Sequence, residues 1–177
     1  MKYVAFMRNV MIGRRGLERS LLIDAFERHG AKTANSFLAT GNVVFEADAK
    51  TAAAIVARVS KVLLTKINLT EPMFIRSMDT LITLNESNPF GAAPSEDVYE
   101  RCVTFLQEGA LRIETLPFQS VRSDFVAFLG TTTEVFSITR LINGRPGQVG
   151  KWIEEQVGKP VTTRNWNTVE RIIKNYA

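Results

Sequence analysis

Apolar residues recur along this chain with two different spacings, and the spacing predicts whether a segment forms a helix or a strand. In the segment 50–68 they recur at helical spacing, while Arg58 and Lys61 fall outside the apolar stripe. The stripe consists of Ile55, Val56, Val59, Val62 and Leu63. This pattern is typical of an amphipathic helix, whereas short apolar runs such as 72–76 are typical of strands.

The first half of the chain is predicted to alternate strands and helices. In order, the pattern gives a strand at 3–9, a helix at 20–30, two strands within 35–47, a helix at 50–68, a strand at 72–76 and a helix at 77–87. Residues 40–42 supply the turn between the paired strands, and Ser20 and Ser77 are placed to cap the helices that they begin. The order βαββαβ followed by a helix is that of the split βαβ, or ferredoxin-like, plan.

The second half repeats this order after a segment rich in proline, glycine and small residues. Its predicted elements are a strand beginning at 101, a short helix ending near Pro117, two strands within 123–142, a helix at 147–159, a strand at 160–164 and a terminal helix. An order of elements that occurs twice indicates a duplicated module.

Two segments support the duplication because they align without gaps. "PMFIRSMDTLITL" and "PVTTRNWNTVERI" begin 88 positions apart, and Arg76 of the first matches Arg164 of the second. We therefore predict an α+β fold of two pseudo-symmetric βαββαβ-type (ferredoxin-like) modules, each with its sheet covered by helices. The modules are expected at 1–88 and 99–177, joined by a linker at 89–98.

Composition narrows the class of protein. Hydrophobic residues make up 45% and charged residues 23% of the 177, which is an ordinary globular balance. No apolar run approaches the roughly 20 residues of a membrane span, so no membrane association is predicted and the cytoplasm is the expected compartment. One cysteine (Cys102) and one histidine (His29) offer neither a disulfide nor a metal-binding cluster, and no cofactor motif is present. Cys102 is expected to be a small buried hydrophobe.

The first candidate binding region is the arginine-rich segment that follows the first strand. Arg8, Asn9, Gly13 and Arg14 lie in "RNVMIGRRGLER", which carries an excess of positive charge. A glycine-bearing loop between a strand and a helix can hold an anion through its backbone N–H groups. The spacing matches neither a P-loop nor a dinucleotide fingerprint, and a solvated basic loop is the alternative interpretation.

The second candidate region is "TTRNWNT", where the last strand meets the last helix. Arg164, Asn165 and Asn167 stand at a helix start, whose unpaired N–H groups and positive dipole end attract anions. The alternatives are a salt bridge for Arg164 and a helix cap for Asn165. Trp166 begins the apolar stripe of the helix, which favours packing in the core over stacking on a ligand or an interface with a partner.

Four segments carry a resemblance to a known family: "VAFMRNVMIG", "TGNVVF", "NPF" and, most distinctively, "TTRNWNT". With them the chain resembles the uncharacterised bacterial domain-of-unknown-function family 1697. The resemblance implies two pseudo-symmetric α+β modules and brings no established enzymatic activity with it. The family's usual opening is similar to R-G-I-N-V-G-G. Here Arg8 and Gly13 match it, Asn9 and Arg14 replace glycines, and Met11 replaces asparagine.

Three hypotheses for function follow. The first is binding of a small anionic or phosphorylated ligand at the two regions just described. The second is binding of nucleic acid, which a sequence pI of 9.4 permits, although no basic and aromatic pattern marks a central strand. The third is an enzyme of unrecognised class, for which the sequence identifies no catalytic residues. The oligomeric state is left open.

Overall fold

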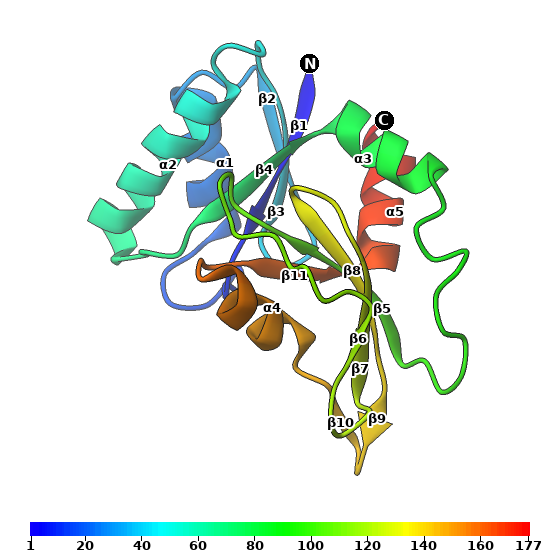
Figure 1. Ribbon diagram of the computed structural model, residues 1–177. Helices are drawn as coiled ribbons and strands as arrows, with labels where there is room; N and C mark the ends of the chain where they lie inside the picture. The colour runs from blue at the N-terminus through cyan, green and yellow to red at the C-terminus, as the bar shows by residue number, and fades with distance from the viewer. The chain divides into compact units, whose positions relative to one another are not determined.

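The computed structural model describes every residue of the chain, 1–177. It contains eleven strands, β1 to β11, and five helices, α1 to α5, in an α+β fold (Figure 1). The chain divides into two compact units. The N-terminal unit consists of Met1–Thr83 with Ile172–Ala177, and the C-terminal unit consists of Leu84–Arg171. The α+β class agrees with the sequence analysis, whereas the module boundaries inferred there stay a prediction.

The first half of the chain follows the predicted order of elements. They are β1 (Lys2–Met7), α1 (Arg19–Arg28), β2 (Thr33–Phe37), β3 (Asn42–Glu46), α2 (Ala52–Ile67), β4 (Met73–Ser77) and α3 (Met78–Glu86). The four strands form one antiparallel sheet in the order β2-β3-β1-β4. The predicted cap of α3 is confirmed, because Ser77 Oγ accepts the Thr80 N–H at 3.1 Å. The predicted cap of α1 is wrong: the helix begins at Arg19, and no side chain caps it.

Helices α1 and α2 pack against one face of this sheet (Figure 1). Tyr3, Ala5 and Met7 alternate along β1, so they point to the same side of the sheet. They share a buried cluster with Phe26 of α1 and Val59 of α2. Each fully buried large apolar side chain contributes about 1.5–3 kcal/mol, and the cluster therefore holds both helices on the sheet.

The hairpin between β2 and β3 is a tight structure built around two residues of the "TGNVVF" segment. Gly41 has a φ of +72°, which favours glycine. Its carbonyl accepts the Met7 N–H at 2.8 Å, which ties the turn to the end of β1. Asn42 is fully buried and donates its Nδ2 hydrogens to Phe37 O at 2.9 Å and Thr40 Oγ1 at 3.1 Å. The turn is thereby fixed beside the loop that follows β1.

The second half contains more strands than predicted. They are β5 (Glu100–Phe105), β6 (Phe118–Gln119), β7 (Phe125–Gly130), β8 (Glu134–Thr139), β9 (Leu141–Ile142), β10 (Arg145–Pro146) and β11 (Thr162–Asn165), with the helices α4 (Val149–Val157) and α5 (Trp166–Tyr176). Five of the strands form an antiparallel sheet in the order β11-β5-β8-β7-β6, and β9 and β10 form a separate short hairpin.

The helix predicted to end near Pro117 is wrong, because residues 106–117 form no helix. Gly109 takes a φ of +67°, which breaks a right-handed helix soon after the end of β5. Pro117 disfavours the helical conformation at the residue before it. Only a few residues remain between these two breaks, too few for a stable helix without strong packing.

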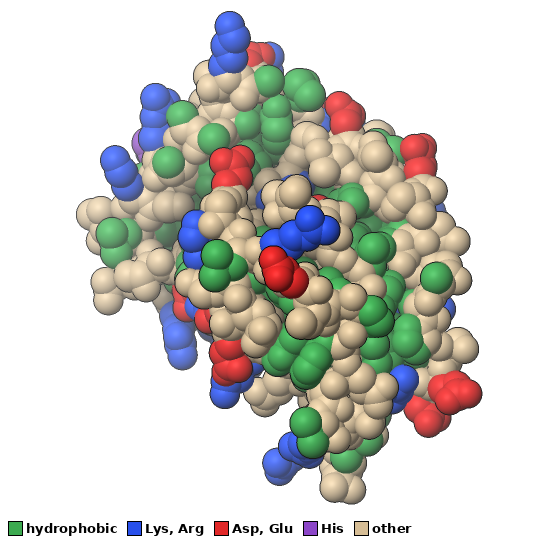
Figure 2. All heavy atoms as spheres, in the orientation of Figure 1, with side chains coloured by type: hydrophobic (Ala, Val, Ile, Leu, Met, Phe, Trp, Pro, Cys, Tyr) green, Lys and Arg blue, Asp and Glu red, His purple; other side chains and the backbone are tan.

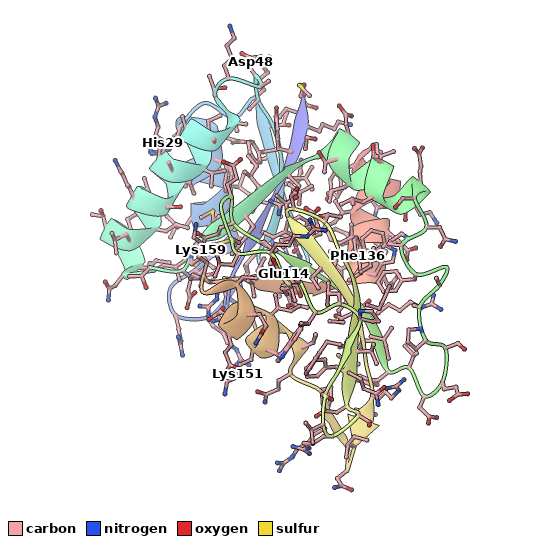
Figure 3. The ribbon with its side chains drawn as sticks, viewed as in Figure 1. His29, Asp48, Glu114, Phe136, Lys151 and Lys159 are labelled. Carbon is pink, nitrogen blue, oxygen red and sulfur yellow. The ribbon has the colours of Figure 1, made fainter.

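None of the five helices is both long and apolar enough to cross a bilayer. On the face drawn in Figure 2, Lys and Arg side chains lie among Asp and Glu side chains. His29, labelled in Figure 3, directly follows the last residue of α1.

Candidate functional site

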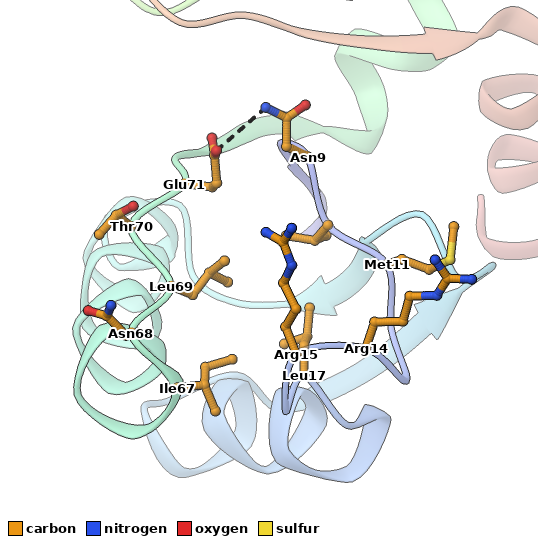
Figure 4. A pocket seen from close by; sticks show the side chains of 11 residues that line it. Asn9, Met11, Arg14, Arg15, Leu17, Ile67, Asn68, Leu69, Thr70 and Glu71 are labelled. Carbon is orange, nitrogen blue, oxygen red and sulfur yellow. Dashed lines mark hydrogen bonds between the residues drawn. The ribbon is translucent and has the colours of Figure 1, made fainter.

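The arginine-rich loop after β1 lines an open cavity of about 560 Å³ in the N-terminal unit (Figure 4). We call it the loop cavity. Its lining consists of Asn9, Val10, Met11, Arg14, Arg15, Leu17, Ile67, Asn68, Leu69, Thr70 and Glu71. One wall is the loop 9–17, and the other wall is the segment 67–71 that connects α2 to β4.

The sheet brings these two walls together. β1 and β4 run antiparallel with Met7 opposite Met73, so the end of β1 lies beside the start of β4. The pairing continues one step beyond the strands, where the Arg8 N–H donates to Pro72 O at 3.2 Å. The loop that leaves β1 must therefore pass the segment that enters β4.

Backbone hydrogen bonds fix the shape of the loop. The Ile12 N–H donates to Ala39 O at 2.8 Å, which attaches the loop to the β2–β3 turn. The Gly13 N–H donates to Leu17 O at 2.9 Å, and the Leu17 N–H donates to Arg14 O at 3.0 Å. Gly13 has a φ of +87°, so it shapes the loop. Its N–H is already engaged, and the loop therefore does not use it as an anion donor.

An ion pair connects the two walls at one end of the cavity. Arg8 Nη1 lies 2.5 Å from Glu71 Oε2, and both side chains are partly exposed. Asn9 Nδ2 lies 3.5 Å from the other carboxylate oxygen, Glu71 Oε1, as the dashed line in Figure 4 marks. Arg8 and Glu71 neutralise each other, so this pair adds little net charge to the cavity.

Arg14 and Arg15 remain as exposed charges on the loop wall, and neither forms an ion pair. In Figure 4 the Arg15 side chain extends toward the middle of the hollow, whereas the Arg14 side chain turns toward Met11. Two guanidinium groups without carboxylate partners give this wall a positive potential.

Arg164 of the second candidate region has a different environment. It is 8% exposed, and its Nη1 donates to Thr162 Oγ1 at 2.8 Å and to Thr163 O at 3.0 Å. Burial lowers the pKa of its guanidinium to about 10. Arg164 is therefore enclosed by its own strand, and it has little room to reach a ligand.

The two asparagines beside it belong to the start of α5. Asn165 Oδ1 accepts the Asn167 N–H at 3.0 Å, which is the geometry of a helix cap. Asn165 Nδ2 also donates to Glu100 Oε1 at 3.3 Å. The side chain of Asn167 is exposed. The capping interpretation of Asn165 is confirmed. The Asn167 N–H, one of the backbone donors at the helix start, is therefore already engaged.

Replacing Asn165 by alanine is expected to lower the free energy of unfolding by about 1 kcal/mol, because the cap is lost. Asn167→Ala is the matched control, since its exposed side chain makes no hydrogen bond, and it is expected to change stability by less than about 0.5 kcal/mol. Urea denaturation of both variants measures the difference. Equal losses in the two variants would contradict the capping assignment.

Trp166 is a core residue of the C-terminal unit, as its apolar stripe predicted. It is 5% exposed, and its ring centroid lies 5.7 Å from that of Phe90 and 5.6 Å from that of Phe136. Phe90 belongs to the "NPF" segment of the sequence, and Phe136 lies on β8 (Figure 3). The aromatic group fills the interior and offers no open ring face for a ligand.

Cys102 is also a core residue. It is a free thiol, 4% exposed, on β5. Burial, with a smaller effect from the nearby Glu100, raises the pKa of the thiol to about 12. A thiol that stays protonated at neutral pH is a poor nucleophile. No group of three or more His, Cys, Asp or Glu side chains is placed to hold a metal ion.

The structure thus brings together one of the two predicted regions and adds residues that the sequence analysis missed. Asn9 and Arg14 line the loop cavity, whereas Arg164, Asn165 and Asn167 lie in the C-terminal unit and form no part of its lining. The missed residues are those of the wall 67–71, whereas Arg15 lies within the arginine-rich segment that the sequence indicated. The predicted topology could have identified the wall 67–71, because in the split βαβ plan the fourth strand begins beside the end of the first.

Comparisons with known proteins identify relatives without an assigned activity. A family model described as "Protein of unknown function (DUF1697)" matches residues 1–131. Among solved structures, the chain is similar to the conserved bacterial protein SP0830 from Streptococcus pneumoniae, with a TM-score of 0.66 and 17% sequence identity. That match covers 98% of this chain and 97% of the other. No curated protein matches the sequence.

Proposed function

Since the chain belongs to the DUF1697 family, whose description assigns no activity, we propose a function from the geometry of the site. We propose that this is a cytoplasmic binding protein for a small anionic or phosphorylated ligand, and that the ligand occupies the loop cavity. Arg14 and Arg15 supply the positive charge. Arg8 and Asn9 hold the end of the cavity through Glu71.

One observation carries this proposal: two unpaired guanidinium groups stand on the wall of a preformed hollow large enough for a metabolite. Pockets of about 300–1,000 Å³ are typical of sites for small ligands, and the loop cavity of about 560 Å³ lies within this range. Arginine binds phosphate and carboxylate groups through two parallel hydrogen bonds. An anion is therefore the ligand group that this wall favours.

The rest of the lining determines what else the ligand contains. Leu17, Ile67 and Leu69 supply apolar surface, and Asn68 and Thr70 carry side chains that donate and accept hydrogen bonds. A site of this kind orients a ligand by a few polar contacts and gains affinity from apolar ones. We therefore propose a ligand with an apolar part in addition to its anionic group.

Strand register supports a further proposal, that the two units are pseudo-symmetric ferredoxin-like modules. Val4 of β1 pairs with Arg76 of β4, and Val103 of β5 pairs with Arg164 of β11. The two arginines also share a hydrogen bond of the same kind. Nη1 of each donates to the carbonyl of the preceding residue, at 2.8 Å in Arg76 and 3.0 Å in Arg164.

The hairpin turns give a second correspondence. Asn42 begins β3 opposite Phe6, and Glu134 begins β8 opposite Phe105. Both polar side chains are buried, and both hold a turn: Asn42 donates to Thr40 Oγ1, and Glu134 Oε2 accepts from Thr131 Oγ1 at 2.7 Å. A duplication predicts that residues at equivalent strand positions, such as Asn42 and Glu134, stabilise equivalent turns. The missing helix at 106–117 is the main departure from the symmetry.

A thermal-stability screen with phosphate-bearing and carboxylate metabolites tests the binding proposal. A ligand present at 100 times its Kd stabilises the native state by about 2.7 kcal/mol, which raises the Tm of a chain this long by about 5–10 °C. We expect Arg14→Ala/Arg15→Ala to remove this rise, because the anion loses its charge partners.

Arg58→Ala is the matched control, since Arg58 is an exposed arginine of α2 that lies outside the loop cavity. It removes the same charge and is expected to keep the full rise in Tm. An equal loss in the control would mean that net charge alone attracts the anion. Stabilisation by single-stranded DNA, with none by small anions, would favour the nucleic-acid hypothesis instead.

A further inference from the structure

The loop cavity has basic side chains on one wall, Arg14 and Arg15, and an acidic side chain, Glu71, on the other. Both kinds of charge restrict the ligands that the cavity can bind. We infer that the ligand is a zwitterion: it carries a cationic group as well as an anionic one, joined through an apolar part. This inference rests on the proposed function, because it assigns the chemistry of the ligand in the same cavity.

Glu71 is the acidic group of the wall 67–71. Its Oε2 accepts from Arg8, whereas its Oε1 faces Asn9 Nδ2 at 3.5 Å. That distance is at the outer limit of a hydrogen bond, so Oε1 keeps its capacity to accept a stronger donor. The Glu71 side chain is 27% exposed and lines the cavity, so a ligand can reach it. An ammonium group is the donor that a carboxylate oxygen favours.

The end of helix α2 adds to the negative character of this wall. The helix ends at Ile67, and Asn68 follows in the left-handed conformation with a φ of +53°. The Asn68 and Leu69 N–H groups donate back to Leu64 O and Leu63 O, so the chain turns away directly after the helix. The carbonyl end of a helix carries partial negative charge, and Ile67 and Asn68 both line the cavity.

The two kinds of charge face a common apolar surface. Arg14, Arg15 and Leu17 belong to the loop wall, whereas Glu71 and the end of α2 belong to the opposite wall (Figure 4). Arg8 already pairs with Glu71 Oε2, so a ligand with only an anionic group leaves the second carboxylate oxygen, Oε1, without a strong donor. A ligand with both groups places each against its complement, and its apolar part covers Leu17, Ile67 and Leu69.

Three probes on one scaffold test this inference. L-phenylalanine carries both charges, 3-phenylpropionate lacks the ammonium group, and 2-phenylethylamine lacks the carboxylate. Calorimetric titration of the full-length protein measures the Kd of each. Because a hydrogen bond to a charged group contributes about tenfold or more in affinity, we expect L-phenylalanine to bind at least about tenfold more tightly than either of the others.

The variant Glu71→Gln assigns the difference to this carboxylate. It is expected to bring the Kd values of L-phenylalanine and 3-phenylpropionate to within about twofold of each other, since the anion contact at Arg14 and Arg15 is common to both. Glu27→Gln is the matched control, because Glu27 is an exposed carboxylate of α1 outside the cavity, and it is expected to preserve the tenfold difference.

The Kd values of the three probes for the wild-type protein test the inference even if Glu71→Gln does not fold. Equal affinities for L-phenylalanine and 3-phenylpropionate would overturn the inference and leave the proposed anion site standing. Failure of all three probes would also overturn the inference, while the metabolite screen decides separately on anion binding. A tenfold preference that persists in Glu71→Gln would assign the cation to another group and overturn the role of Glu71.

Discussion

Replacing Trp166 by alanine is expected to lower the free energy of unfolding by about 3–5 kcal/mol, the range for removing a large aromatic side chain from a core. The indole is 5% exposed and lies within 5.7 Å, between ring centroids, of both Phe90 and Phe136. Alanine leaves a cavity that these rigid rings cannot fill, and it removes the edge contact with Phe136. Urea denaturation followed by far-UV circular dichroism measures the loss.

The second tryptophan provides a control of the same type. Trp152 stacks on Phe118 at a centroid distance of 4.3 Å, but both rings are only partly buried. We therefore expect Trp152→Ala to cost less than Trp166→Ala, because less apolar surface is exposed to water by the change. A loss below about 1 kcal/mol in Trp166→Ala would mean that the ring is not a core residue, and the ligand-stacking interpretation would return.

Replacing Gly41 by alanine is expected to destabilise the N-terminal unit by about 3 kcal/mol, through two effects. The φ of +72° disfavours any residue with a Cβ, which costs about 1–2 kcal/mol. A Cβ would also lie 2.3 Å from Val10 Cγ2 and 2.9 Å from Met7 Cβ, so both neighbours must move. Since Val10 lines the loop cavity, the same change is expected to weaken anion binding.

Gly144→Ala separates the two effects. Gly144 also has a φ of +72°, but a Cβ there would meet no atom within 4 Å. It is expected to lose about 1–2 kcal/mol, from backbone strain alone. Thermal or urea denaturation of the two variants gives the comparison. An equal loss of unfolding free energy in both variants would mean that the close approach of Val10 to the turn does not contribute to the cost of Gly41→Ala.

Much of the fold followed from the spacing of apolar residues, and the exceptions have physical causes. The strands and helices of the first half were predicted because each buries one clear face, as α2 does with Ile55, Val59 and Leu63. The apolar stripe that begins at Trp166 continues along α5 through Ile172, which is fully buried, whereas the neighbouring Ile173 is only partly buried. The segment 106–117 was misread because its few apolar residues also suit an irregular loop.

The candidate site was harder to predict, because charge along a sequence does not reveal burial. Arg164 and Arg14 are both arginines near the end of an element, yet one is enclosed by its own strand and the other is exposed. The wall 67–71 carries no basic or glycine-rich pattern, and only the sheet register places it opposite the loop. The role of Glu71 in particular depends on its ion pair with Arg8, which lies 63 positions away in the sequence.

A titration of ¹⁵N-labelled protein with the most stabilising anion, followed through its amide chemical shifts, tests the central claim directly. Binding in the loop cavity predicts saturable shifts concentrated at 9–17 and 67–71, which Arg14→Ala/Arg15→Ala removes and Arg58→Ala retains. Saturable shifts centred on 164–167 instead, or no saturable shifts at all, would contradict the account.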